Sequence, residues 1–378
     1  MYGAKDLHQS TCPSAHCFVC SILTVLLPVI RGLLNKFLVL CTLLLATRLC
    51  AMDVAYTPPV GGMNINVPAG QTRSVSIPLV HAPAGAGKII GQVTGVGSAY
   101  IDVADANWTP GAFSQASNPY YVRFTTGASA GRVLLVSSTA NTATRLFVSN
   151  DGVDLTTSGG PAAGDRYELV LADTLSSLFG TTTLQGGTNA NSADNVLVWG
   201  NTAWVIYYYN TGNSKWQRST DIAASPSRDN FVLRPDRGIM ITRRASSDLN
   251  LAVTGRVPEI GARAVHLRPG VSFLSLGIPK DITLGDLALH TRTAGWISAA
   301  DAASAAGADK IQVWGNTAWT IYYRNSSGNW QRTTDIAGSP SRNGVMIPAG
   351  RPVMVSRATS ASGTATLLNL PINYTIDR

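Results

Sequence analysis

Two pairs of aromatic residues have the type and spacing to bind a ligand by stacking. Trp199 and Tyr207 lie in and just after the stretch Val198–Trp204, which recurs letter for letter around Trp314 and is again followed by a tyrosine, Tyr322. Exposed flat rings of this kind bind sugars and partner proteins. Most large aromatic side chains are instead substantially buried, so a covering segment of the chain is the alternative. If the rings are exposed, each copy offers one platform, and the expected ligand is a repeating polysaccharide or another surface protein.

Asp221 and Asp335 are the carboxylates best placed for acid–base chemistry. Each follows one copy of the repeated stretch and lies three residues after an arginine, Arg218 or Arg332. Two carboxylates facing each other across a cleft could hydrolyse a glycosidic bond. An Asp just beyond a strand more often caps a turn or forms a local ion pair. The sequence leaves both interpretations open.

Two short motifs suggest other chemistry but lack the context that it needs. Residues 127–131 match the G-x-S-x-G pattern around Ser129, but apolar runs typical of strands lie on both sides. A hydrolase nucleophile needs a strand before the serine and a helix after it, so a hairpin turn is expected here. The glycine-rich segment 84–88 lacks the first glycine and the Ser or Thr of a phosphate-binding loop. We therefore expect no bound nucleotide or other cofactor.

Metal-ligating residues are also poorly arranged. After residue 51 the histidines are His81, His266 and His290, and none has a second histidine or a carboxylate at ligand spacing. The segment 150–154 contains two aspartates but too few ligands for a known calcium loop, so it predicts a turn. We expect no metal site.

The repeated stretch predicts a β-hairpin with one buried face. Alternate residues of a strand face opposite sides of a sheet. A three-residue loop, Gly200–Thr202, would pair Val198 with Trp204 and would keep one apolar face separate from a more variable one. The buried face would then carry Val196, Val198, Trp204, Ile206 and Tyr208. Trp199 and Tyr207 would share the variable face, as would Trp314 and Tyr322 in the second copy.

Residues 1–51 predict an export signal. The apolar runs 18–30 and 37–46 are each too short to span a bilayer. Lys36, the run after it and the small residues up to Ala51 match the basic, apolar and cleavage regions of a signal peptide. All five cysteines lie in this segment, so the processed chain would have no disulfide. Export without disulfides favours the bacterial envelope or the extracellular space, and no membrane span is expected after the leader is removed.

The chain after the leader predicts a mainly β protein in three parts. Short alternating segments separated by Gly, Pro, Ser and Asn predict a β-sandwich or barrel-like domain over residues 52–165. The duplication predicts two tandem homologous β-rich units with minor helix, at 166–258 and 259–378. Each unit is expected to open with a helical turn, and the alanine-rich segment 298–307 predicts the one longer helix.

The net charge of +8 is spread along the chain, so its basic residues predict a solvated surface and no nucleic-acid partner. Three motifs occur in order: Ser76–Val80, Asn107–Gly111 and Tyr121–Gly127. With the tyrosine-rich hairpin, they resemble an uncharacterised family of secreted, β-rich bacterial proteins. The resemblance implies export and β structure, and it implies no activity. We expect an exported structural or interaction protein, and the alternative is a glycan-binding module or a glycan-acting hydrolase.

Overall fold

The computed structural model describes residues 60–77, 79–80, 89–157, 159–257, 262–277, 280–358 and 366–371. This part of the chain is mainly β, with 39% strand and 6% helix in several antiparallel sheets, which confirms the expected class. The leader, His81 and the glycine-rich segment 84–88 lie outside the described residues. Across the described ranges, no helix is both long enough and apolar enough to cross a membrane.

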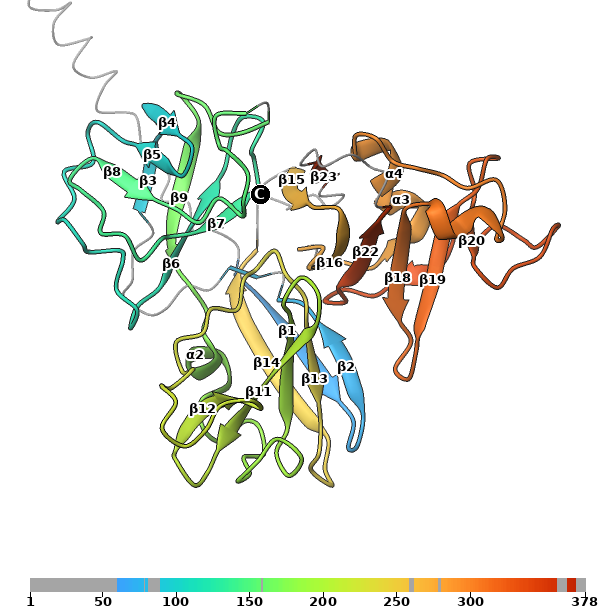
Figure 1. Ribbon diagram of the computed structural model, residues 1–378, viewed down its shortest axis with the longest axis horizontal. Helices are drawn as coiled ribbons and strands as arrows, with labels where there is room; N and C mark the ends of the chain where they lie inside the picture. The colour runs from blue at the N-terminus through green and yellow to red at the C-terminus, as the bar shows by residue number, and fades with distance from the viewer. Residues whose placement is uncertain are drawn as a thin grey trace, which may run out of the picture. The chain divides into compact units, whose positions relative to one another are not determined.

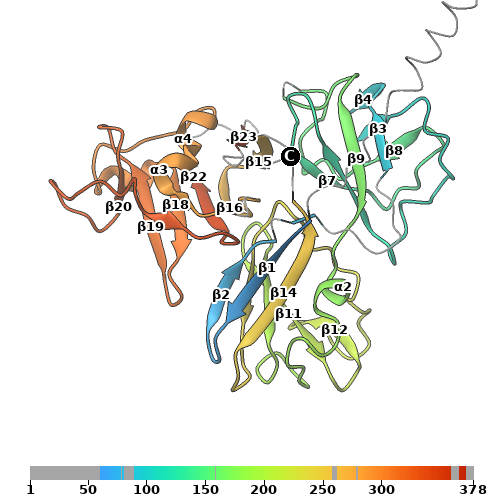
Figure 2. The same ribbon diagram turned by 180° about the vertical axis from the view of Figure 1, so that it is seen from behind.

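The first copy of the repeated stretch forms the middle of a five-stranded sheet, called sheet 1 here. On one side of the hairpin, β10 (Asn195–Trp199) pairs with β13 (Ile239–Thr242). β13 in turn pairs with β2 (Thr72–Val75), which lies far earlier in the sequence. The strands β1 and β14 pair beside it and lie side by side in Figures 1 and 2. The order of sheet 1 is β12 (Lys215–Arg218), β11 (Trp204–Asn210), β10 (Asn195–Trp199), β13 (Ile239–Thr242) and β2 (Thr72–Val75), while β1 spans Val60–Val67 and β14 spans Leu249–Arg256.

The second copy forms a sheet of the same order, called sheet 2. Its strands are β16 (Gly270–Leu274), β22 (Val353–Arg357), β18 (Lys310–Trp314), β19 (Trp319–Arg324) and β20 (Trp330–Arg332). The adjoining pair is β15 (Ala262–Leu267) with β23 (Thr366–Pro371), which corresponds to β1 with β14. A further pair joins β17 (Ile282–Thr283) to β21 (Met346–Ile347). Figure 1 shows β18, β19 and β22 side by side.

Residues 89–171 form two other sheets that share one core. Strand pairings cross the boundary expected at residue 165, because β9 lies between β3 and β6. Ser129 lies in the turn between β6 and β7, so the hairpin predicted there is confirmed. The larger sheet, sheet 3, has the order β3 (Ile89–Gln92), β9 (Arg166–Leu171), β6 (Tyr120–Phe124) and β7 (Val133–Leu135), and the smaller has β4 (Gly95–Gly97), β5 (Tyr100–Asp102) and β8 (Arg145–Phe147).

The short helices begin where capping residues allow. Thr174 caps α2 (Leu175–Phe179) and accepts a hydrogen bond from Ser177 N, while Thr283 caps α3 (Leu284–Leu287) in the same way. These are the helical turns expected before each hairpin. A second turn, α4 (Leu289–Arg292), follows α3.

The alanine-rich segment 298–307 does not form the predicted helix. Only η1 (Ser304–Gly307) is helical, and it is a single 3₁₀ turn. Ala299 instead pairs with Asn325 as an isolated bridge, and Ala305 packs with Tyr323 in a small buried cluster. Tertiary packing therefore overrides the helix propensity of alanine.

The hairpin register differs from the expected one by one residue. Val196 lies opposite Tyr207, and Trp199 lies opposite Trp204. Gly200 N donates to Ala203 O over 2.9 Å, and Asn201 takes a left-handed conformation (φ 77°), so the turn centres on Asn201 and Thr202. A shift of one residue moves each side chain of one strand to the other face. The predicted loop was therefore wrong, and so was the grouping of Trp204 with Val196.

Candidate functional site

The two candidate tyrosines belong to the protein interior. Tyr207 is 2% exposed and packs in the core of sheet 1 with Val196 and Trp216. Tyr322 is 3% exposed and packs in the matching core of sheet 2. In each hairpin the tryptophan, Trp199 or Trp314, lies on the face opposite to that of the tyrosine. The expectation that a Trp and a Tyr share one face was therefore wrong, for the reason of register given above.

The two candidate tryptophans make reciprocal contacts between sheet 1 and sheet 2. Trp199 Nε1 donates to the carbonyl oxygen of Val271 in β16, and the distance is 2.9 Å. Trp314 Nε1 donates to the carbonyl oxygen of Thr72 in β2, also over 2.9 Å. Each ring is half-buried and packs edge to face on the tryptophan across its own hairpin. Other segments of the chain thus cover part of each ring. A covering segment was the alternative to an exposed platform that the sequence left open.

Phe273 lies at the centre of this contact. It is fully buried, and its ring meets Trp204 of sheet 1 and Trp319 of sheet 2 at centroid distances of 5.2 and 5.8 Å. Met240 and Met354, which take matching positions in the two sheets, complete the buried cluster. The face of each hairpin that points away from its own core therefore packs against the other sheet and is partly covered by it.

Trp199 also lines a cavity of about 280 Å³. The cavity combines an aromatic wall with charged side chains from three separate parts of the chain. Its principal lining residues are Trp199, Phe231, Arg234, Arg237, Arg268 and Asp151. Of the four aromatic residues singled out in the sequence, the structure brings one to this cavity.

The arginines of this cavity differ in how far they are neutralised. Arg234 makes paired hydrogen bonds to Asp151, at 2.7 and 3.0 Å, and to Asp236, at 2.9 and 2.8 Å. Arg237 Nε lies 3.5 Å from the same Asp236 carboxylate. Arg268 makes no hydrogen bond or ion pair with any residue that the structure describes. Of the arginines that line this cavity, Arg268 is therefore the one best able to bind a ligand.

Two further basic groups lie close behind the cavity. Arg132 is buried, and its Nε and one terminal nitrogen have no hydrogen-bond partner among the described residues. Burial lowers the pKa of Arg132, and the neighbouring Asp151 opposes that shift. Burial, with the charges of Arg132 and Arg268, lowers the pKa of His266 to about 4, so its ring is neutral at pH 7. The cluster therefore holds four arginines and two aspartates, and its positive excess favours an anion.

Sequence reasoning missed these arginines because they are far apart in the chain. Arg234 and Arg237 precede β13, Arg268 lies between β15 and β16, and Arg132 precedes β7. No spacing rule joins positions from three segments. The one local signal is the dense Arg-Pro-Asp-Arg run at 234–237, which resembles an ordinary charged turn.

The candidate carboxylates serve the local structure. Asp221 accepts from Arg218 N over 3.0 Å and from two nitrogens of Arg228 over 2.9 and 3.0 Å. Asp335 makes the equivalent contacts in the second copy: it accepts from Arg332 N over 2.9 Å and from two nitrogens of Arg342 over 3.0 and 2.8 Å. The arginine hydrogen bonds lower the pKa of both carboxyl groups. The turn-capping and ion-pair interpretation of these residues is confirmed.

The polar side chains of the remaining motifs are held by hydrogen bonds within the fold. Ser129 Oγ donates to Gly159 O over 2.9 Å. Asp154 accepts from Thr156, while Asp151 is held by Arg234 as described above. Among the described residues, no three His, Cys, Asp or Glu side chains gather in a way that could hold a metal ion.

Comparison with known proteins adds no identity: no protein family, curated protein or solved structure matches the chain. The resemblance to a secreted bacterial family stays a prediction.

Proposed function

We propose that this protein is an exported interaction protein that binds an acidic polysaccharide in the cavity beside Trp199. The observation that carries the proposal is the meeting of an aromatic wall with an arginine that has no partner among the described residues, Arg268. Aromatic rings stack on the apolar faces of sugars. Arginine recognises carboxylate and sulfate groups with paired hydrogen bonds. A sugar that carries such a group uses both features together.

The charge balance selects an acidic ligand over a neutral one. A neutral glycan would leave Arg268 and the positive excess behind it uncompensated in a partly buried site. A carboxylate on the ligand would supply the missing charge. Salt should therefore weaken binding, because free ions screen the attraction between partly exposed charges.

A binding assay with two polymers tests the proposal. The parent protein is titrated with polygalacturonate and with neutral dextran, each at low and at moderate ionic strength. We expect binding to polygalacturonate alone, with weaker affinity at the higher salt. Arg268→Met should reduce that affinity at least about tenfold, since one charged hydrogen bond contributes about 1.5–3 kcal/mol.

Arg244→Met is the matched control, because Arg244 is an exposed arginine outside the cavity. It removes the same charge and should bind like the parent. Equal loss in both variants would reduce the effect to net charge. Equal binding of dextran and polygalacturonate would refute the choice of an acidic ligand.

The two five-stranded sheets support a further part of this proposal, that the chain contains two copies of one unit. The second copy is continuous over residues 262–371. The first copy is interrupted, with β1 and β2 before residues 89–171 and its remaining strands after them. Identical strand order and reciprocal tryptophan contacts support this arrangement. Separate expression of 262–371 would test it, since a folded monomer with native-like β content is expected.

Export is proposed from the leader sequence. The processed protein should begin near Met52. N-terminal sequencing of protein recovered from the envelope or medium checks this, and recovery of the intact leader would contradict it.

A further inference from the structure

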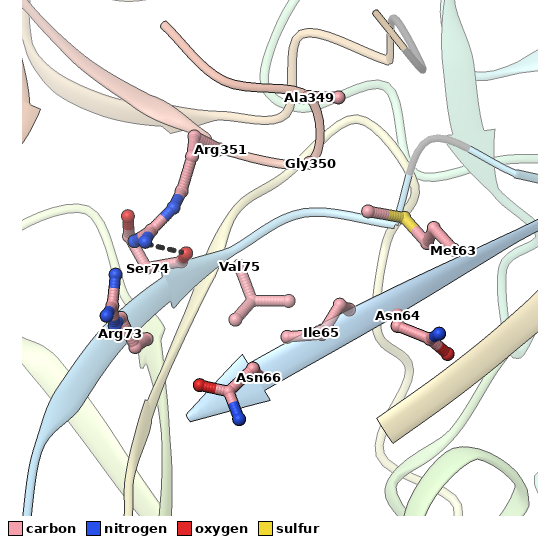
Figure 3. A pocket seen from close by; sticks show the side chains of 10 residues that line it. All are labelled: Met63, Asn64, Ile65, Asn66, Arg73, Ser74, Val75, Ala349, Gly350 and Arg351. Carbon is pink, nitrogen blue, oxygen red and sulfur yellow. Dashed lines mark hydrogen bonds between the residues drawn. The ribbon is translucent and has the colours of Figure 1, made fainter. Parts of the chain in front are cut away.

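A second cavity, of about 240 Å³, lies where β1, β2 and the segment 349–351 meet. It does not include Trp199 or Arg268, so it is distinct from the site described above. Figure 3 shows its two charged side chains, Arg73 and Arg351, with their guanidinium groups near Ser74. Within the part of the chain that the structure describes, no aspartate or glutamate lines this cavity.

The polar groups of this cavity are incompletely partnered. Arg351 makes one long hydrogen bond, 3.4 Å, to the carbonyl oxygen of Ser74. Arg73 Nε and Ser74 Oγ are buried atoms without a hydrogen-bond partner among the described residues, and Ser74 as a whole is 2% exposed. Burial and the charge of Arg73 both lower the pKa of Arg351. Two like charges in a partly buried site without a counter-ion are costly unless an anion joins them.

The corresponding corner of sheet 2 shows what is missing. Ser275 N donates to Asp236 O over 3.2 Å, and in the same way Ser76 N donates to Gly350 O over 2.8 Å. Asp236 and Gly350 therefore take matching positions, each directly before an arginine. Arg237 lies against the carboxylate of Asp236, whereas Gly350 offers Arg351 no carboxylate.

Position 73 differs in the opposite direction. Arg73 lies opposite Ile241, and the residue at the same place in sheet 2 is Ser272, which lies opposite Val355. One corner thus holds an arginine, an aspartate and a serine, and the other holds two arginines and a glycine. The corner at Arg237 contains its own carboxylate, Asp236. Among the described residues, the corner at Arg351 has no such carboxylate and contains a second arginine, Arg73.

We propose that Arg73 and Arg351 bind a tetrahedral oxyanion, a phosphate or sulfate group, with Ser74 Oγ as a further donor. Arginine pairs suit such groups because each guanidinium presents parallel N–H donors to two oxygens. The cavity has room for the anion together with a small ester group. The anion would also link β2 of sheet 1 to the segment 349–351 that leads into β22 of sheet 2.

Thermal unfolding at constant ionic strength tests this inference with inorganic phosphate and with glycerol phosphate as probes. Sodium chloride replaces each probe in the reference samples. We expect the melting temperature to rise with phosphate concentration and to saturate, as it does for a ligand that binds only the folded state. Either probe supports the site, and the one that saturates at lower concentration identifies a free ion or an ester as the natural form.

Two variants locate the effect. Arg73→Ser introduces the residue found at the matching position of sheet 2, so it should fold, and Arg351→Met keeps the apolar stem of the side chain. Each should raise the phosphate concentration needed for half of the effect at least tenfold. The surface variant Arg244→Met, which lies outside both cavities, should respond like the parent. A parent response equal to that in chloride, or an unchanged response in Arg73→Ser, would overturn the proposal.

Discussion

Replacing Phe273 with alanine should remove the centre of the contact between the two five-stranded sheets. Phe273 is fully buried, and its ring meets one tryptophan from each sheet, Trp204 at 5.2 Å and Trp319 at 5.8 Å. Phe-to-Ala changes in cores cost about 3–5 kcal/mol. Each aromatic pair contributes about 0.5–1.5 kcal/mol of such a loss, so the two pairs explain a large share of it.

Urea unfolding, followed by tryptophan fluorescence and near-ultraviolet circular dichroism, measures the effect. Phe273→Ala should lower the free energy of unfolding by the amount above and should weaken the near-ultraviolet signal of the tryptophan cluster. Phe113→Ala is the matched control, because Phe113 is also buried and also has two edge-to-face partners, at 5.5 and 5.3 Å, within the core of residues 89–171. It should destabilise that core and leave the cluster signal at the intensity of the parent.

The reasoning would be refuted if Phe273→Ala lowered the free energy of unfolding by less than about 0.5 kcal/mol, which is the range of a surface substitution. It would also be refuted if the near-ultraviolet signal stayed unchanged. Either result would mean that the two sheets do not share this core.

Three further predictions concern pH. Burial lowers the pKa of His266 to about 4, so its contribution to stability should be complete above pH 6.5 and lost as the pH falls toward 4. An imidazole NMR titration with a midpoint near 6.5 would contradict this. The lowered carboxyl pKa of Asp335 gives stability that is present above pH 3.8 and lost below it, so Asp335→Asn should flatten the acid limb of the stability profile, and Asp221→Asn should do the same. Burial raises the pKa of Tyr121 and of Tyr167 to about 12, so their contribution to stability should be complete below pH 10 and should fall as the pH rises toward 12. Absorbance at the phenolate band should show that both residues ionise only as the protein unfolds.

Much of the secondary structure could be predicted from local sequence. The alternating segments became strands close to their expected positions. The helical turns expected before each hairpin also formed, and the structure shows that Thr174 and Thr283 cap them. The hairpin itself was also predictable. The alanine-rich segment failed because its packing on Tyr323 depends on residues distant in the chain.

The register of the hairpin could not be predicted by searching for one buried face. Both faces of β10 and β11 are covered, one fully and one in part: Val196 and Tyr207 face the core of sheet 1, while the partly buried Leu197 and Trp204 face sheet 2. An apolar pattern selects a register when one face is wet and one is dry. Here both faces of the hairpin carry apolar residues, so the pattern does not select one register. The second face is apolar because it packs on the other sheet, and that contact is a tertiary feature.

By itself, the sequence determined the β class and the two copies of the hairpin, because strand alternation and repetition are visible along the chain without knowledge of its packing. Tertiary structure alone decided the rest. It paired β2 with β13 across residues 89–171, and it turned Tyr207 into core and Trp199 into a cavity wall. It also brought arginines from separate segments together beside that wall. The interaction between charges depends on their distance in space, and these positions come close only when the sheets pack.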